Sequence, residues 1–144
     1  MLSSQPLHIR GTRHDDIRGF LWFNNLASLA EFQRVYIIEN SAYSPMRGWH
    51  GHKLESKGFI CLLGSVRIGG VKVEDWNTPS TSTDTFSADL TQDSMDFVYL
   101  PAGYANAILS LTPKSRVMVF SSSTLEESQD DDYRFPTSTW RIDA

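Results

Sequence analysis

The sequence has a single cysteine, Cys61, and no block of basic residues. One cysteine excludes a disulfide within the chain, and its apolar neighbours predict a buried thiol in a reducing, cytoplasmic setting. The 13 Lys and Arg residues are outnumbered by 17 Asp and Glu, so we expect no nucleic-acid partner. The N-terminal residues contain no apolar run long enough for a signal peptide or a membrane span, and we expect no membrane partner.

Helix signals are also scarce. The best candidate is the short segment 24–32, with Asn24 or Asn25 as its cap. Residues 77–84 are expected to form a polar loop, and the acidic residues 125–135 a helical turn or a loop. Because no repeat or domain boundary stands out, residues 1–144 are expected to form a single domain.

Short apolar stretches bounded by Gly, Pro, Ser or Asp dominate the sequence instead. They are rich in β-branched and aromatic residues, and several alternate with polar residues, as half-buried strands do. The expected strands are residues 34–40, 59–68, 70–76, 95–100, 106–111 and 115–121. This pattern predicts an all-β antiparallel sandwich or barrel, for which a jelly roll is one closed solution, with a mouth that can hold a small ligand.

Residues 47–58, RGWHGHKLESKG, place two histidines one residue apart. On an extended chain His50 and His52 project from the same face, and Glu55 follows closely. This set resembles the first metal-binding motif of cupins. Their second motif ends in a histidine after a Pro-x-Gly turn, where this sequence has Asn106, a poor ligand for transition metals. A bound metal is therefore not expected.

Proton transfer is the second interpretation of the histidine pair, because imidazole accepts and returns protons near neutral pH. Arg47 and Lys57 lie nearby in the sequence and favour negative charge, such as an enolate oxygen formed next to a carbonyl. The third interpretation is a solvated turn with Trp49 buried. Spacing alone does not choose among the three.

Five short motifs resemble, in order, those of the dTDP-4-dehydrorhamnose 3,5-epimerases and related sugar-nucleotide enzymes of the cupin superfamily. They are DIRGF at 16–20, ENS at 39–41, RGWH at 47–50, Lys57 followed by Gly64, and PAGYAN at 101–106. The resemblance covers nearly the whole chain. It implies a cupin-type jelly-roll barrel, an isomerase without metal or organic cofactor, and a homodimer in which the N-terminal segment packs on the partner.

The same resemblance implies a substrate and roles for several residues. The substrate is a nucleoside-diphosphate 4-keto-6-deoxy sugar, epimerised next to its C4 ketone in a pathway such as bacterial surface-polysaccharide synthesis. His50 is implied as the base and Lys57 as the group that stabilises the enolate oxygen. Asp131 or Asp132 is implied to orient His50.

Substrate contacts are implied at five further positions. Arg18 and Arg47 hold the diphosphate or the nucleotide, and Arg18 reaches into a neighbouring subunit. Asn40, Tyr104 and Asn106 are the other expected contacts, because they belong to the motifs that resemble the family.

One position departs from the epimerases. Their catalytic tyrosine aligns with Val119, which cannot transfer a proton, so we expect inversion at a single carbon. Sugar-nucleotide 3,4-ketoisomerases instead combine a histidine pair with a tyrosine on the preceding strand, an arrangement that Tyr36, His50 and His52 resemble. Ketoisomerisation is the alternative activity, and a non-catalytic module that binds sugar nucleotides is the third.

Overall fold

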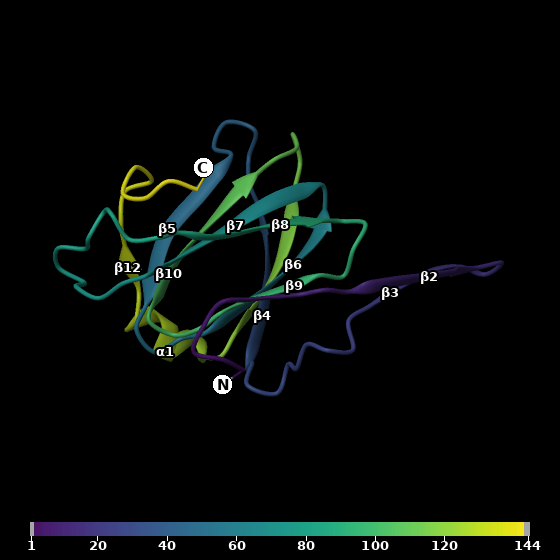
Figure 1. The fold of residues 1–144 in the computed structure, drawn as a ribbon, viewed down its shortest axis with the longest axis horizontal. Helices are drawn as coiled ribbons and strands as arrows, with labels where there is room; N and C mark the ends of the chain where they lie inside the picture. The colour runs from purple at the N-terminus through teal and green to yellow at the C-terminus, as the bar shows by residue number, and fades with distance from the viewer. Residues whose placement is uncertain (1, 143–144) are drawn as a thin grey trace.

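The structure is a computed structural model that describes residues 2–142. These residues form two five-stranded antiparallel sheets and a separate two-stranded hairpin (Figure 1). The first sheet has the strand order β1–β9–β6–β11–β4, and the second has the order β12–β5–β10–β7–β8. Neighbouring strands therefore come from distant parts of the chain, as in a jelly roll. The predicted all-β class is confirmed, with two facing sheets in place of one closed barrel.

The elements have the following bounds. The first sheet contains β1 (Leu7–Ile9), β9 (Phe97–Leu100), β6 (Lys57–Leu63), β11 (Arg116–Ser121) and β4 (Arg34–Glu39). The second contains β12 (Tyr133–Arg134), β5 (Met46–His52), β10 (Tyr104–Ser110), β7 (Ser65–Lys72) and β8 (Phe86–Thr91). The hairpin consists of β2 (Thr12–Asp16) and β3 (Gly19–Phe23), and a short helix, α1 (Leu125–Gln129), precedes β12.

Apolar side chains gather in three layers, one between the sheets and one on the outer face of each. Their large members include Phe59, Ile68 and Leu90 between the sheets, Phe97 and Tyr99 on the first sheet, and Trp49 and Trp140 on the second. Full burial of a large apolar side chain contributes about 1.5–3 kcal/mol. The predicted burial of Cys61 is confirmed, and burial raises the pKa of its thiol to about 11.

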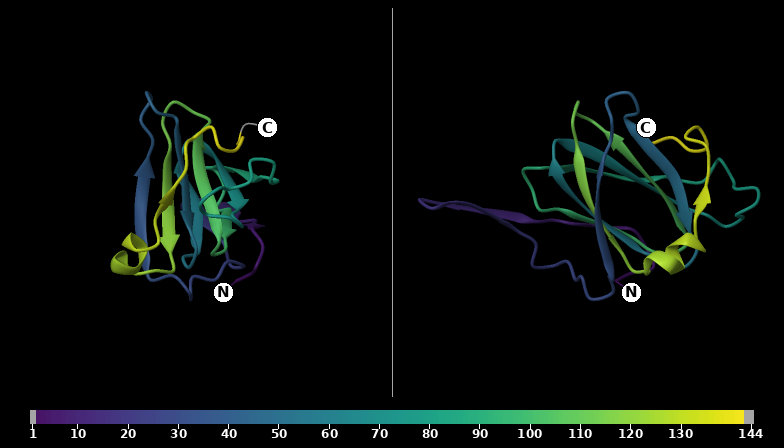
Figure 2. Two further views of the ribbon diagram at one scale, coloured as in Figure 1. Left: turned by 90° about the vertical axis from the view of Figure 1, so that its left-hand side faces the viewer. Right: turned by 180° about the vertical axis from the view of Figure 1, so that it is seen from behind.

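The β2–β3 hairpin projects as an arm from the body of the two sheets (Figures 1 and 2). Every residue of β2 is exposed. At the tip, the apolar side chains of Ile17, Phe20 and Leu21 are also exposed. The arm thus buries little of its apolar surface against its own chain.

Several predicted boundaries agree with the structure, and others are wrong. The segments expected at 34–40, 95–100, 106–111 and 115–121 correspond to β4, β9, β10 and β11. Residues 59–76 turn at Gly64, where φ is +70°, and the glycine pair expected to separate two strands lies inside β7. That pair packs closely against Trp49, Leu100 and Ile142, which explains the missing side chains.

The helix expected over residues 24–32 is absent from the structure, which has no α-helix in this segment. The Asn24 side-chain oxygen accepts hydrogen bonds from the backbone N–H groups of Leu26 and Ala27, as a helix cap does, but no helix follows. The Asn24 amide instead ties the segment to the backbone oxygens of Ile9 and Met95. A short helix does form within the acidic segment, where Thr124 and Glu127 make a capping box. No helix in residues 2–142 is long and apolar enough to cross a membrane.

Candidate active site

A cavity of about 160 Å³ lies between the two sheets and is lined by side chains from both. The first sheet contributes Tyr36 and Ile38 from β4, Lys57 and Phe59 from β6, and Val119 from β11. The second contributes Arg47 and His50 from β5, and Asn106 and Ile108 from β10. Five of the residues selected from the sequence thus meet in one cavity, namely Tyr36, Arg47, His50, Lys57 and Asn106.

A bulge in β5 turns two of its polar side chains into this cavity. Asn106 of β10 pairs with His50, but the next residue of β10 pairs with Gly48, so Trp49 is an extra residue. Gly48 has a φ of +137°, and a side chain there would collide with β10. Because of the extra residue, Arg47 and His50 both line the cavity although they are three positions apart.

His50 is half-buried, and its surroundings favour the neutral imidazole. Burial lowers the pKa of His50, the positive charge of Arg134 lowers it further, and the negative charge of Asp132 partly opposes them. The Asn106 amide donates to the His50 backbone oxygen at 3.1 Å. At neutral pH, His50 therefore presents a ring nitrogen that can accept a proton.

Tyr36 and Lys57 form a hydrogen-bonded pair on the opposite wall. The Lys57 Nζ to Tyr36 Oη distance is 2.7 Å. An ammonium group has three donors and no acceptor, so Lys57 donates to the phenol oxygen. The hydrogen of the Tyr36 hydroxyl is thereby left for another acceptor, such as a ligand in the cavity.

Val119, which the sequence resemblance aligns with the tyrosine of the epimerases, is a residue of β11. It is buried, lines the cavity, and pairs in register with Tyr36 on the neighbouring strand β4. Paired residues of adjacent strands lie on the same face of a sheet. The cavity thus has a phenol on the same wall as Val119, displaced by one strand.

His52 shares the inward face of β5 with His50 but is buried behind the cavity lining. Its Nδ1 lies 2.7 Å from the Asp131 backbone oxygen, which only accepts, so Nδ1 carries the hydrogen of this bond. Burial lowers the pKa of His52, the charge of Lys57 lowers it further, and Glu55 opposes both. The second ring nitrogen of His52 is buried without a hydrogen-bond partner among the described residues.

Asp131 and Asp132 have different surroundings. The Asp131 carboxylate accepts backbone hydrogen bonds from residues 53, 54 and 55 at 2.7–3.1 Å and so fixes the turn between β5 and β6. Asp132 accepts a bond from Arg134 at 3.2 Å, and its charge acts on His50. The described contacts of both carboxylates include no hydrogen bond to the His50 ring.

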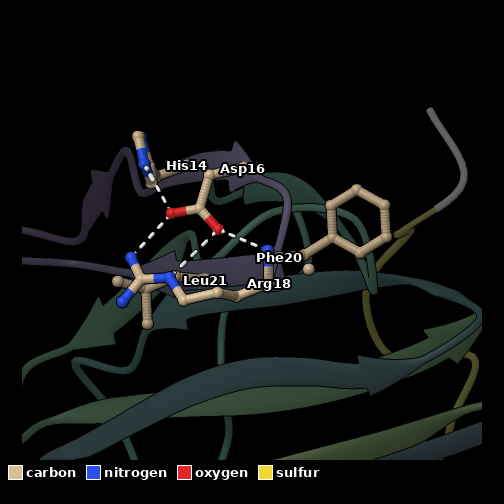
Figure 3. Close-up of a pocket in the computed structure, with 6 residues that line it drawn as sticks. His14, Asp16, Arg18, Phe20 and Leu21 are labelled. Carbon is tan, nitrogen blue, oxygen red and sulfur yellow. Dashed lines mark hydrogen bonds and ion pairs between the residues drawn. The ribbon is translucent and has the colours of Figure 1, made fainter.

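Three other expected contacts lie outside the cavity lining. The Asn40 amide donates to the backbone oxygens of Pro45 and Ile108, which holds the loop between β4 and β5. Tyr104 lines a separate recess next to β8. Arg18 is at the tip of the arm, where it lies 2.6 Å from Asp16 (Figure 3).

Sequence reasoning considered Glu55 only as a metal ligand. Its carboxylate is fully buried and accepts hydrogen bonds from Ser121 and Ser128. Burial alone raises the pKa of Glu55, but the positive charge of Lys57 and the two hydroxyl groups outweigh it and the net pKa is lowered. Residues 2–142 contain no group of three or more His, Cys, Asp or Glu side chains placed to hold a metal ion.

Comparison with solved structures identifies the same fold in sugar-nucleotide enzymes. The rmlC epimerase of Mycobacterium tuberculosis is 21% identical, with a TM-score of 0.75 over 92% of this chain and 70% of that chain. The QdtA 3,4-ketoisomerase of Thermoanaerobacterium thermosaccharolyticum, a double mutant in complex with TDP, is 24% identical, with a TM-score of 0.65 over 91% and 88%. ChmJ of Streptomyces bikiniensis, a 3'-monoepimerase in complex with dTDP-quinovose, is 18% identical, with a TM-score of 0.73 over 92% and 70%.

Sequence comparisons give a family but no individual relative. No curated protein sequence matches this chain. The profile of the family described as "FdtA: WxcM-like, C-terminal" matches residues 7–139, which include both walls of the cavity and most of the arm-bearing N-terminal segment. The chain therefore belongs to the FdtA, WxcM-like C-terminal family.

Proposed function

We propose that this protein is an isomerase that epimerises a nucleoside-diphosphate 4-keto-6-deoxy sugar at the carbon next to its C4 ketone. The observation that carries the proposal is the position of His50 and Tyr36 on opposite walls of one cavity. Epimerisation requires a proton to leave one face of a carbon and to return to the other. Two solved proteins of the same fold hold TDP or dTDP-quinovose, which supports this class of substrate.

The proposed reaction needs only groups that line the cavity. A neutral ring nitrogen of His50 takes the proton next to the ketone, and the electrons of the C–H bond form an enolate. Lys57 stabilises the negative oxygen as it forms. Tyr36 returns a proton to the opposite face, and the enolate becomes a ketone again. The imidazolium then gives its proton to solvent and the phenolate takes one from solvent, so no proton is gained or lost.

We assign binding of the nucleotide portion to one cationic group and one amide, both on the second sheet. Arg47 lines the cavity, and a guanidinium can bind a diphosphate through two parallel hydrogen bonds. Asn106 adds an amide on the same wall. Neither group changes its charge during the proposed reaction, so both act in binding.

A second candidate is 3,4-ketoisomerisation. Position 119 has a valine in place of a tyrosine, and Tyr36 lies on β4. Both features favour this reaction, because the ketoisomerases that the sequence resembles carry their tyrosine on the strand before the histidine pair. In this reaction C3 loses a proton, the enolate oxygen at C4 gains one to give an enediol, O3 loses its hydrogen and C4 gains a proton. His50 and Tyr36 are the groups available for these transfers.

Incubation with dTDP-4-keto-6-deoxyglucose in deuterated water tests the proposal. In an epimerase reaction, the proton NMR signal of C3 or C5 disappears as deuterium replaces hydrogen, and the product is inverted at that carbon. A 3-keto product identifies the ketoisomerase. Tight binding without exchange indicates a non-catalytic binding module and rejects both reactions.

We further propose a homodimer in which Arg18 contacts the substrate in the cavity of the partner. The arm extends away from the two sheets of its own chain (Figure 1) and exposes apolar side chains at its tip, which supports a contact with a second copy. Arg18→Ala and His50→Ala chains are each expected to be inactive. Co-expression of the two is expected to restore activity, because a hybrid dimer has one cavity with both groups. Absence of this recovery contradicts the shared site.

A further inference from the structure

Glu55 lies in the turn between β5 and β6, behind the cavity lining, and its carboxylate has no exposed area. Ser121 Oγ donates to Oε2 at 2.6 Å, and Ser128 Oγ donates to Oε1 at 2.8 Å. A buried carboxylate costs several kcal/mol unless charges and hydrogen bonds compensate for lost water. No step of the proposed reaction described above uses the Glu55 charge.

Three cationic or basic side chains surround the carboxylate, and each comes from a different strand. Lys57 Nζ of β6 lies 3.6 Å from Glu55, His52 Nδ1 of β5 lies 3.5 Å away, and Arg34 Nη2 of β4 lies 3.7 Å away. Of these three, Lys57 also lines the cavity. Lys57 is thus a direct link between Glu55 and Tyr36.

We propose that Glu55 is a positioning residue that orients the Lys57 ammonium so that it donates to the oxygen of Tyr36. The inference rests on the proposed function and adds a residue that does not touch the substrate. Lys57 donates one N–H to Tyr36 and forms an ion pair with Glu55 at 3.6 Å. Because an ammonium group has three donors, a further N–H is available to the substrate oxygen.

This arrangement decides the direction of the Tyr36 hydroxyl. While Lys57 donates to the phenol oxygen, the hydroxyl hydrogen of Tyr36 points to an acceptor other than Lys57. The substrate in the cavity is that acceptor. When Tyr36 gives up its proton, the adjacent ammonium stabilises the phenolate. Removal of the Glu55 charge is therefore expected to lower the rate of proton return, although Glu55 itself does not contact the substrate.

The test is a double-mutant cycle between Glu55→Gln and Tyr36→Phe, with kcat and KM measured for inversion. Glu55→Gln keeps the size of the side chain and removes its charge. We expect kcat to fall about 30-fold and KM to change less than about threefold, because the lost interaction acts in the transition state. In the Tyr36→Phe background the same change is expected to lower kcat less than about threefold. If the kcat losses of the two single variants multiply in the double variant, the proposal is overturned.

Glu31→Gln is the matched control. Glu31 accepts hydrogen bonds from Ser56 at 2.6 Å and Tyr99 at 3.2 Å, and it does not line the cavity. The kcat of the Glu31→Gln variant is expected to equal that of the wild type. If Glu55→Gln fails to fold, Lys57→Met is compared with and without Glu55→Gln, since the double change removes both buried charges. Equal kcat values support the proposal, and a further tenfold loss overturns it.

A crystal structure of Glu55→Gln decides the inference independently of activity. We expect the distance between Lys57 Nζ and Tyr36 Oη to increase beyond hydrogen-bonding range in the variant. Retention of this contact in the variant overturns the positioning role. A wild type that inverts no substrate overturns the proposed function alone, because the crystallographic result still accepts or rejects the role of Glu55.

Discussion

The two walls of the cavity hold their polar groups in different ways. On the second sheet, His50 is half-buried, and the exposed charges of Asp132 and Arg134 shift its pKa in opposite directions. On the first sheet, Tyr36 and Lys57 bond to each other, and the buried Glu55 lies behind them. One wall thus presents a neutral acceptor, and the other presents a donor next to a cation.

This difference matches the demands of the two halves of a proton-transfer reaction. A base needs a free lone pair, which the lowered pKa of His50 provides at neutral pH. An acid becomes more effective when a nearby cation stabilises its conjugate base, and Lys57 is in contact with Tyr36. The walls are therefore expected to fail in different ways when each is altered.

The largest effect is expected from His50→Ala. Without the base, no proton leaves the substrate, so deuterium exchange and inversion are both expected to fall by about 10³-fold or more. The dissociation constant of dTDP, measured by calorimetry, is expected to change less than about threefold, since the cationic groups remain. His8→Gln is a control histidine outside the cavity lining. Exchange at the wild-type rate in His50→Ala would refute the assignment of the base.

Tyr36→Phe tests the other wall and is expected to separate the two measurements. His50 still removes a proton and can return a deuteron to the same face, so exchange continues. Inversion is expected to fall about 100-fold, because the opposite face has lost its donor. NMR of the substrate and product in deuterated water measures both rates. An equal loss of exchange and inversion contradicts the placement of base and acid on opposite walls.

Short runs of β-branched and aromatic residues predicted much of this architecture. Strands β4 and β11 are such runs, and their burial alternates because every second residue faces the core between the sheets. The strands β2 and β3 lack this pattern because the arm is exposed, and they were not predicted as strands from alternation. At residues 24–32 the capping bonds of Asn24 form without a helix, and its amide contacts distant backbone oxygens that the local sequence does not specify.

The site could be predicted only in part for a related reason. The histidine pair and Lys57 are close in the sequence, so the local pattern is enough to select them as candidate site residues. The bulge at Trp49 depends on how β5 pairs with β10, which the local sequence does not specify. Likewise, the partners of Glu55 include Ser121 and Ser128, more than 60 positions away, so its role depends on tertiary contacts.

A smaller effect, on stability, is expected at the turn behind the second wall. Asp131→Ala leaves the N–H groups of residues 53, 54 and 55 without their carboxylate acceptor. We expect the free energy of unfolding in urea to fall by about 2 kcal/mol. Asp132→Ala removes only a partly exposed contact with Arg134 and is expected to cost less than about 1 kcal/mol. Equal losses would show that the turn does not depend on Asp131.

The smallest effect is a change in pH dependence, and it tests whether the second wall responds to exposed charge. The proposed reaction requires neutral His50, so kcat/KM is expected to rise with pH through a pKa below the usual value of 6.5. Asp132→Asn removes a charge that raises this pKa, so the acid limb is expected to move to lower pH. Arg134→Gln removes a charge that lowers it, so the limb is expected to move to higher pH. Each shift is expected to be less than about one pH unit, because both charges are near solvent.

The opposite signs of these two shifts make the pair of variants informative. A general loosening of the site changes both profiles in the same direction, whereas a Coulombic effect on one imidazole moves them apart. Both shifts are expected to shrink at high salt, since the interactions of exposed charges are screened. Tyr36→Phe is expected to leave the acid limb of the exchange rate in place, because the lone pair that titrates belongs to the other wall. A common direction for Asp132→Asn and Arg134→Gln would assign the acid limb to a group other than His50.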